Sequence, residues 1–198
     1  MNIFITHYTP LVDRKEMIVK QLENENIKNY EFIENYDKEE IKTIDTEKFT
    51  NIKLSEISLF LKHVEIFKKE LDDIVIILED DAILVNNFKN NLNDYLDKLQ
   101  NIEWDILFCG ECCNLHFYKE NNKIFYETTD SRGTCMYILN KGVSKKIYDI
   151  FINETFIDKA IDLWFNNMSK KYNLKYLWSE PTLVHQGSEI GIFNSAIR

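Results

Sequence analysis

Short apolar runs alternate along the chain with longer segments whose apolar residues recur at helical spacing. Runs rich in β-branched and aromatic residues predict strands at 2–7, 30–33, 74–78, 104–108, 135–139 and 176–178. Apolar stripes predict helices at 12–24, 54–70, 86–99, 142–152 and 157–168. Strands alternate with helices in the first half, and this order predicts an α/β sandwich with a central mixed, mostly parallel sheet.

Two further features bear on the organisation of the chain. Residues 116–119 and 123–127 flank the asparagine pair 121–122, whose tolerance of positive φ predicts a β-hairpin. A polar tail that contains glycine follows residue 180. No repeat or low-complexity linker interrupts the 198 residues, so the sequence predicts a single domain over 1–198.

The apolar run 74–78 leads directly into three carboxylates, Glu79, Asp80 and Asp81. Such a run is typical of a central parallel strand that is buried on both faces. Three adjacent acids repel one another unless a cation neutralises them, and α/β proteins place phosphate-gripping metals at the carboxyl ends of strands. A solvated loop that caps the next helix is the alternative, but capping needs only one acid. The cluster therefore favours a divalent-metal site.

Composition excludes several classes of function. The net charge is −9, with 33 acidic against 24 basic residues, whereas general nucleic-acid binding needs a basic surface. No run approaches the ~20 apolar residues that span a bilayer. The N-terminus has no charged segment followed by a long apolar core, so no signal peptide is predicted and the expected location is cytoplasmic.

Four cysteines, at positions 109, 112, 113 and 135, raise the question of a zinc or redox site. A structural zinc site needs four ligands, and only Cys135 is available to complete the group formed by the other three. A single C-x-x-C spacing is a weak signal. Free thiols in a reducing compartment are therefore the favoured interpretation.

Several segments resemble, in the same order, the motifs of glycosyltransferase family 25, which contains lipooligosaccharide galactosyltransferases and collagen galactosyltransferase domains. They are residues 12–16, 54–63, 77–81, 133–142, 157–164 and 180–188. The sequence departs from the family pattern at Lys62, where the family has Ser, and at Ser58, where it has Gly. It also reads Thr6-His7-Tyr8 where the family has an Asn/Ser-Leu pair.

The resemblance implies a Rossmann-like α/β/α sandwich of the GT-A type that uses a UDP-sugar donor with Mn²⁺ or Mg²⁺. A divalent cation with oxygen ligands stabilises the charge that develops on a departing diphosphate. Asp81 and Glu79 are the expected metal ligands. His185 is a third candidate, although a structural histidine is an equal alternative.

Further residues are expected at the donor and acceptor. The expected donor-binding set is Thr6, His7, Arg14, Glu79, Asp80, Arg132, Gly133 and Thr134. Asp162 is the expected general base and Asp158 the second candidate, because four-residue spacing would put both on one helical face. A capping Asp158 with an exposed Asp162 is the alternative.

The leading hypothesis is a transferase that moves galactose or glucose to a hydroxyl of a glycan or hydroxylated protein, with inversion. The alternative is an inactive, glycosyltransferase-like glycan-binding module. A metal-dependent hydrolase is less favoured, because two-metal sites require a second carboxylate motif that the sequence lacks. A second subunit is a candidate for completing the acceptor side, so a homo-oligomer is possible.

Overall fold

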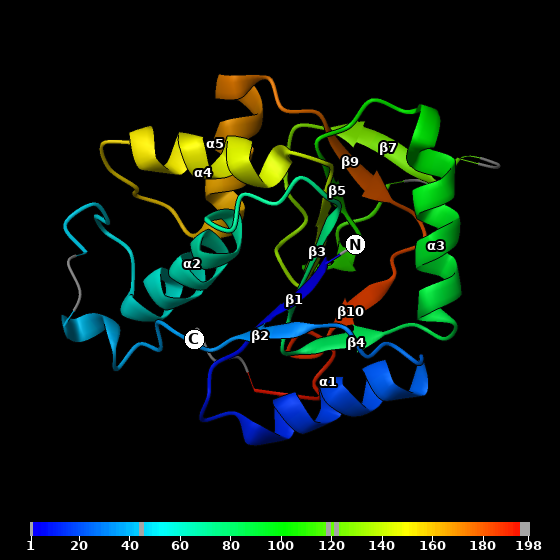
Figure 1. Cartoon of the computed structure of the whole chain (residues 1–198), viewed down its shortest axis with the longest axis horizontal. Helices are drawn as coiled ribbons and strands as arrows, with labels where there is room; N and C mark the ends of the chain where they lie inside the picture. Colours follow the sequence, from blue (N-terminus) through cyan, green and yellow to red (C-terminus); the bar gives the residue numbers. More distant parts are fainter. Residues whose placement is uncertain (1, 44–45, 118–119, 121–122, 195–198) are drawn as a thin grey trace.

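A seven-stranded sheet with the strand order β2-β1-β3-β8-β5-β9-β7 forms the centre of the protein (Figure 1). The structure is a computed structural model that describes residues 2–43, 46–117, 120 and 123–194. The strands are β1 (Asn2–Thr6), β2 (Glu31–Ile33), β3 (Val75–Glu79), β5 (Ile106–Phe108), β7 (Phe125–Thr128), β8 (Met136–Leu139) and β9 (Tyr176–Ser179). All run in one direction except β8 and β7, which run antiparallel to their neighbours. The predicted mixed, mostly parallel sheet is therefore confirmed.

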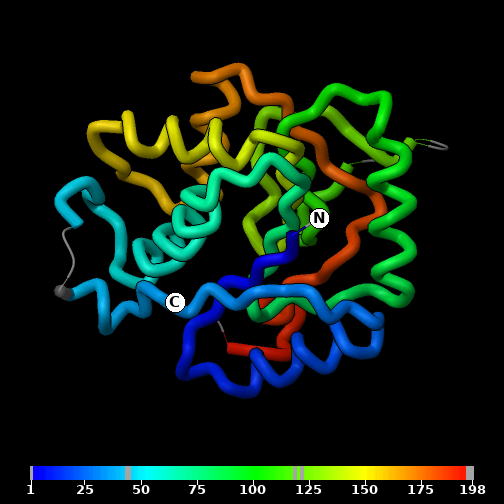
Figure 2. The backbone as a smooth tube through the Cα atoms, in the orientation of Figure 1, coloured from blue at the N-terminus to red at the C-terminus, as the bar shows by residue number. Residues whose placement is uncertain are grey.

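Helices cover both faces of this sheet (Figures 1 and 2). On one face α1 (Val12–Asn24) and α3 (Phe88–Lys98) pack on alternate residues of β1 and β3, including Ile5 and Leu78. On the other face lie α2 (Leu54–Phe67), α4 (Val143–Asn153) and α5 (Ile161–Tyr172), which pack on residues such as Phe4 and Ile77. Successive side chains of a strand point to opposite faces, so each central strand supplies both cores. The α/β/α sandwich is confirmed.

A small second sheet, which the sequence pattern did not predict, lies beside the end of β3. It consists of β4 (Ala82–Leu84), β10 (Val184–Gln186) and β6 (Gly110–Glu111), with β10 antiparallel to β4 and parallel to β6. The strands of this sheet are too short to give an apolar run or an alternation. Just beyond β10, the Gly187 N–H donates to the Asp81 carbonyl oxygen at 2.8 Å. The polar tail is thereby brought next to the carboxylates.

The predicted hairpin is wrong. β7 pairs antiparallel with β9 rather than with the segment before it, and His116 and Phe117 are not in a strand. Residues 118–119 and 121–122, which hold the rest of the predicted first strand and the turn, lie outside the described residues. β7 pairs with the outer edge of β9 and becomes the last strand of the sheet. Its backbone N–H and C=O groups therefore bond to β9 and are not available for a local hairpin.

The start of the predicted helix 157–168 is also wrong. Ile157 is buried and its backbone N–H and C=O bond to Lys48 and Thr50, so it forms a bridge with that segment instead of a helical turn. α5 begins only at Ile161, and Asp158 precedes it. The argument that Asp158 and Asp162 share a helical face therefore fails. Within the described part of the chain, every helix is too short or too polar to cross a lipid bilayer.

Candidate functional site

A cleft with about 620 Å³ of empty space, partly open to solvent, lies at the carboxyl ends of β1 and β3. β1 and β3 are parallel neighbours, so their ends meet at one edge of the sheet, where α/β proteins bind ligands. The walls come from the segments after β1 and β2, the first turn of α1, one side of α2, the end of β3, and the end of β10 with the residues that follow it. All three carboxylates of the acidic cluster line it.

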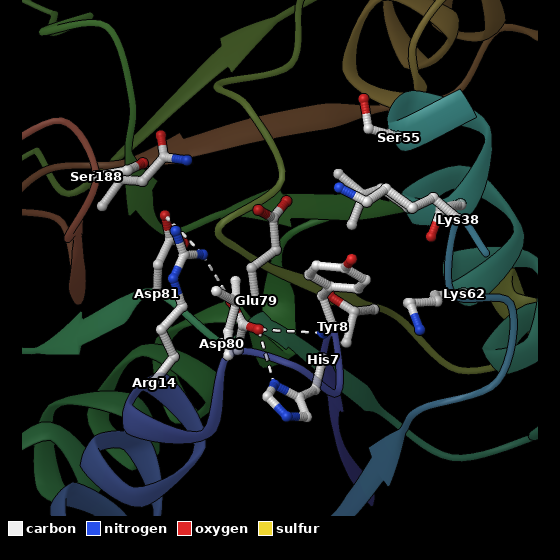
Figure 3. Close-up of a pocket in the computed structure, with 15 residues that line it drawn as sticks. His7, Tyr8, Arg14, Lys38, Ser55, Lys62, Glu79, Asp80, Asp81 and Ser188 are labelled. Atoms are coloured by element: carbon white, nitrogen blue, oxygen red, sulfur yellow. Dashed lines mark hydrogen bonds and ion pairs between the residues drawn. The ribbon is translucent and has the colours of Figure 1, made fainter. Parts of the chain in front are cut away.

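Asp80 is buried and holds the segment after β1 in place (Figure 3). Its Oδ2 lies 2.8 Å from His7 Nδ1 and accepts the Tyr8 N–H at 3.2 Å. Its Oδ1 accepts a hydrogen bond from Arg14 at 2.9 Å. Both oxygens therefore already have strong donors, and Asp80 orients His7, Tyr8 and Arg14 around the cleft.

Asp81, by contrast, has a carboxylate oxygen to which no described residue donates. Among the described residues, Asp81 Oδ1 is buried and has no hydrogen-bond partner. Its Oδ2 lies 3.8 Å from the Arg14 guanidinium, and Ser188 also hydrogen-bonds to this carboxylate. Burial raises the pKa of Asp81, while Ser188 and Arg14 oppose that shift. A buried acceptor without a donor costs free energy unless a ligand supplies the missing interaction.

Glu79 ends β3 next to this orphaned oxygen. Thr134 Oγ1 donates to Glu79 Oε1 at 2.5 Å. Burial, and then the charge of Asp81, raises the pKa of Glu79 to about 8, so the carboxyl is protonated at neutral pH when no cation is near. Two adjacent carboxyls with raised pKa values and hard oxygen donors fit a divalent cation such as Mn²⁺ or Mg²⁺.

Basic and hydroxyl side chains line the cleft on the side away from Asp81. The sequence analysis did not predict this group. Figure 3 shows Lys38, Lys62 and Ser55 across the cleft from Asp81. Lys62 is buried and donates to Asp37 Oδ1 at 2.7 Å. Lys38 Nζ lies 5.0 Å from the centre of the Tyr8 ring. The one signal in the sequence was Lys62, a charged residue of the predicted helix 54–70 at a position where the family has Ser.

Arg132 and Gly133, two residues of the expected donor-binding set, have other roles. Arg132 is fully buried and donates to Glu180 Oε1 at 2.6 Å and to the Ser179 carbonyl oxygen at 3.0 Å, so it ties its loop to the end of β9. Gly133 has a φ of 72°, and a Cβ there would lie 2.7 Å from Cys112 Cβ, so it serves close packing. Neither is among the described residues that line the cleft.

His185 also points to other partners. Its Nδ1 lies 2.7 Å from Glu111 Oε2, and the residue of β10 that lines the cleft is Gln186. The imidazole is thus engaged with Glu111 of the small sheet. We therefore leave His185 out of the proposed ligand set.

The two candidate bases differ in position. Asp162 is half-buried in the first turn of α5, and its charge contributes to the raised pKa of Glu79, which places it near the carboxylates. Its Oδ1 accepts the Leu163 N–H at 2.8 Å. Asp158 is exposed and lies outside the helix. Neither is among the described residues that line the cleft itself.

The sequence matches the model of one known protein family. Residues 1–141, more than two thirds of the chain, match the family described as glycosyltransferase family 25 (LPS biosynthesis protein). The chain belongs to this family. As a family-25 glycosyltransferase it uses a sugar donor and an acceptor. The matched region contains the cleft residues up to Asp81, whereas Asp162 lies beyond it. No curated protein sequence matches the chain.

Several solved structures resemble this glycosyltransferase at low sequence identity. A glycosyltransferase involved in the glycosylation of the major capsid of PBCV-1 is 11% identical, with a TM-score of 0.49 over 93% of this chain and 91% of that chain. A197 from STIV is 12% identical, with a TM-score of 0.47 over 93% and 83%. S. aureus TarS 1–349 is 13% identical, with a TM-score of 0.47 over 100% and 67%. These similarities are too distant to inform the roles of individual residues.

Proposed function

We propose that this glycosyltransferase moves a hexose, galactose or glucose, from a UDP-sugar to a hydroxyl of a glycan or hydroxylated protein, with inversion and with a divalent cation. The observation that carries the proposal is the buried Asp81 Oδ1, which no described residue hydrogen-bonds, in a cleft that a protonated Glu79 also lines. A phosphate-bound cation would satisfy both groups at once.

Asp81 and Glu79 are the residues that would hold Mn²⁺ or Mg²⁺. When bound, the cation would supply positive charge that stabilises the departing diphosphate. Asp80 is not proposed as a ligand, because His7, Tyr8 and Arg14 already occupy its oxygens. Its proposed role is to orient these neighbours.

The donor nucleotide is proposed to lie between Tyr8 and the start of α2. Lys38 Nζ lies over the Tyr8 ring, and both side chains line the cleft, so this wall offers a base an aromatic side chain and a diphosphate a cation. Thr6 and His7 shape the floor below. Thr134 holds Glu79 from the other side, so it acts through that carboxyl rather than on the donor directly.

Asp162 is the proposed general base. In the reaction the acceptor oxygen forms a bond to the anomeric carbon of the sugar, and the bond from that carbon to the diphosphate oxygen breaks. The hydroxyl proton passes to the Asp162 carboxylate, while the electron pair of the broken bond leaves with the diphosphate. A single displacement of this kind inverts the anomeric configuration.

The test is thermal unfolding of wild type, Asp81→Asn and Asp72→Asn with UDP-, GDP- and CMP-sugars, with and without Mn²⁺. Asp72 is an exposed acid at the opposite end of β3, so its variant controls for lost charge. A donor at 100 times its dissociation constant adds about 2.7 kcal/mol to stability. We expect a Mn²⁺-dependent shift with UDP-sugars that only Asp81→Asn abolishes.

No shift with any nucleotide sugar would contradict the proposal. A shift with glycans alone, insensitive to Asp81→Asn, would favour the inactive glycan-binding module. Transfer of the sugar from the donor to an added acceptor would then distinguish a transferase from a protein that only binds the donor.

A further inference from the structure

Two cysteines and a glutamate come together where β6 and β10 end. Cys112 and Cys113 follow β6 directly, and Glu189 lies three residues after β10. β6 and β10 are parallel neighbours, with Gly110 opposite Val184 and Glu111 opposite His185. The two chain segments therefore leave the small sheet at the same edge, and residues distant in sequence meet there.

The three side chains present their ligand atoms to one point. The Sγ atoms of Cys112 and Cys113 lie 3.3 Å apart, and one ligand atom from each of the three residues lies within 4.8 Å of the others. Adjacent side chains in an extended segment point to opposite sides. Here the backbone turns through positive φ at Cys113 and Asn114, at 55° and 52°, which allows the two thiols to face each other.

The chemistry of this group differs from that of the acidic cleft. Thiolates together with a carboxylate suit a borderline-soft d¹⁰ cation such as Zn²⁺, whereas Mn²⁺ and Mg²⁺ prefer oxygen ligands alone. The sequence pattern offered Cys135 as a ligand, but the structure groups Glu189 with Cys112 and Cys113 instead.

We propose that Cys112, Cys113 and Glu189 form a second cation site, for a zinc-class ion, separate from Glu79 and Asp81. Three protein ligands leave one tetrahedral position for solvent, whereas a structural zinc site has four. Cys113 and Glu189 are exposed. The site therefore exchanges its ion with solution and is not required for folding.

Both sides of this site connect to the cleft carboxylates. Cys112 packs against Gly133, and the next residue, Thr134, donates to Glu79. Glu189 follows Ser188, which hydrogen-bonds to Asp81. An ion that joins Cys112 to Glu189 therefore restrains the two segments that support Glu79 and Asp81.

The test uses the full chain, freed of metal by a chelator that is then removed, with a phosphine reductant at a fixed pH of about 8. Burial raises the pKa of the Cys112 thiol, so binding displaces a proton and the pH has to stay constant. Cd²⁺ is the probe, because thiolate ligation gives a near-ultraviolet charge-transfer band. We expect one equivalent to bind, with or without excess Mn²⁺.

The variants separate this site from the cleft. Cys112→Ser and Cys113→Ser should each lose the two-thiolate band. Glu189→Gln should weaken Cd²⁺ binding roughly tenfold or more, since loss of an outer-shell partner already costs 10–100-fold. Glu127→Gln, an exposed glutamate on β7, is the matched control. Asp81→Asn should keep the band, so failure of the proposed donor site would not affect this result.

Absence of the band in wild type, or its persistence in the double variant Cys112→Ser/Cys113→Ser, would overturn the proposal. A second measurement needs only the wild-type protein, so it does not depend on whether the variants fold. Zn²⁺ should slow alkylation of Cys113 by iodoacetamide at least tenfold, as read by mass spectrometry, and an unchanged rate would also overturn it.

Discussion

Asp80 and Asp81 are adjacent acids with opposite surroundings. Asp80 receives donors on both oxygens, including the buried Arg14 guanidinium at 2.9 Å. Asp81 keeps one buried oxygen that no described residue satisfies. The first arrangement stabilises the charged form and fixes neighbouring residues, and the second leaves a carboxylate oxygen for a ligand.

Asparagine at each position should therefore have different effects. Asp80→Asn removes the charge that neutralises the buried Arg14 and should lower the free energy of unfolding by about 3 kcal/mol or more. Asp81→Asn should leave the cation-free protein at least as stable, because burial already disfavours its charged form. It should reduce Mn²⁺-dependent transfer roughly 100-fold or more. Urea unfolding and steady-state rates test both expectations, and equal stability losses would contradict them.

Glu79 should make the cation-free protein less stable as pH rises. Its pKa is about 8 in the folded protein, above the ordinary value of 4.5. The unfolded chain therefore releases this proton first, and stability should fall between about pH 4.5 and 8, by at most about 1.4 kcal/mol per pH unit. Glu79→Gln should remove this component. Unfolding curves with EDTA from pH 5 to 8.5 measure it, and parallel pH profiles for both proteins would count against it.

Asp162 and Asp158 can be separated by kinetics. Asp162→Asn should lower kcat by roughly 10²–10⁴-fold with little change in donor binding, as for loss of a general base. Asp158→Asn should leave kcat within a factor of about two, since this residue is exposed and lies outside α5. The opposite order of effects would reassign the base.

At the scale of elements, the strands of the large sheet that carry apolar runs were predictable, and the strands of the small sheet were not. The strands β1, β3 and β8 have continuous apolar runs because they are buried on both faces. β4, β6 and β10 form only through pairing between distant segments, which no local pattern records. The hairpin prediction failed for the same reason, since β7 pairs with the distant strand β9.

The residues of the candidate site also fall into a group that was predictable from local sequence and a group that was not. Glu79, Asp80 and Asp81 are contiguous in sequence, so their position at a strand end could be inferred locally. The contributions of Lys38, Lys62 and Ser188 depend on which loops fold back onto β1 and β3, and these are tertiary contacts. The placement of Arg132 and His185 failed for the same reason, because Glu180 and Glu111 bind them instead.

The Lys62–Asp37 pair fastens the segment after β2 to α2. Lys62 Nζ also donates to the Glu34 and Asn35 carbonyl oxygens, at 3.0 and 2.8 Å, and Asp37 Oδ2 accepts the Thr9 N–H at 3.2 Å. The pair therefore joins α2, the segment after β2 and the segment after β1, and it fixes one wall of the cleft.

Either single variant, Lys62→Met or Asp37→Asn, should lower the free energy of unfolding by about 3–5 kcal/mol, because a buried charge or acceptor loses its partner. The double variant should lose less than the sum of the two. Both single variants should raise the KM for donor more than they lower kcat, since the pair shapes the cleft wall. Additive losses in the double-mutant cycle would argue against direct coupling.

At the scale of the molecule, the cleft joins the two ends of the described chain. Arg14 of α1 donates to the Asn194 carbonyl oxygen and lies 5.2 Å from the centre of the Phe193 ring. Residues after β10 thus complete a site that begins at β1. The cleft can form only after both ends of the fold are in place.

The position of β8 has a consequence for synthesis. β8 lies between β3 and β5, yet it follows both in sequence. β3 ends at Glu79 and β8 begins at Met136, so 56 residues lie between them, which at ~5–20 residues per second take about 3–11 s to translate. During that time one edge of β3 has no partner, and residues 75–78 are entirely apolar. Each nascent chain therefore passes through several seconds in which the apolar strand that leads into the acidic cluster has an open edge that can pair with another chain.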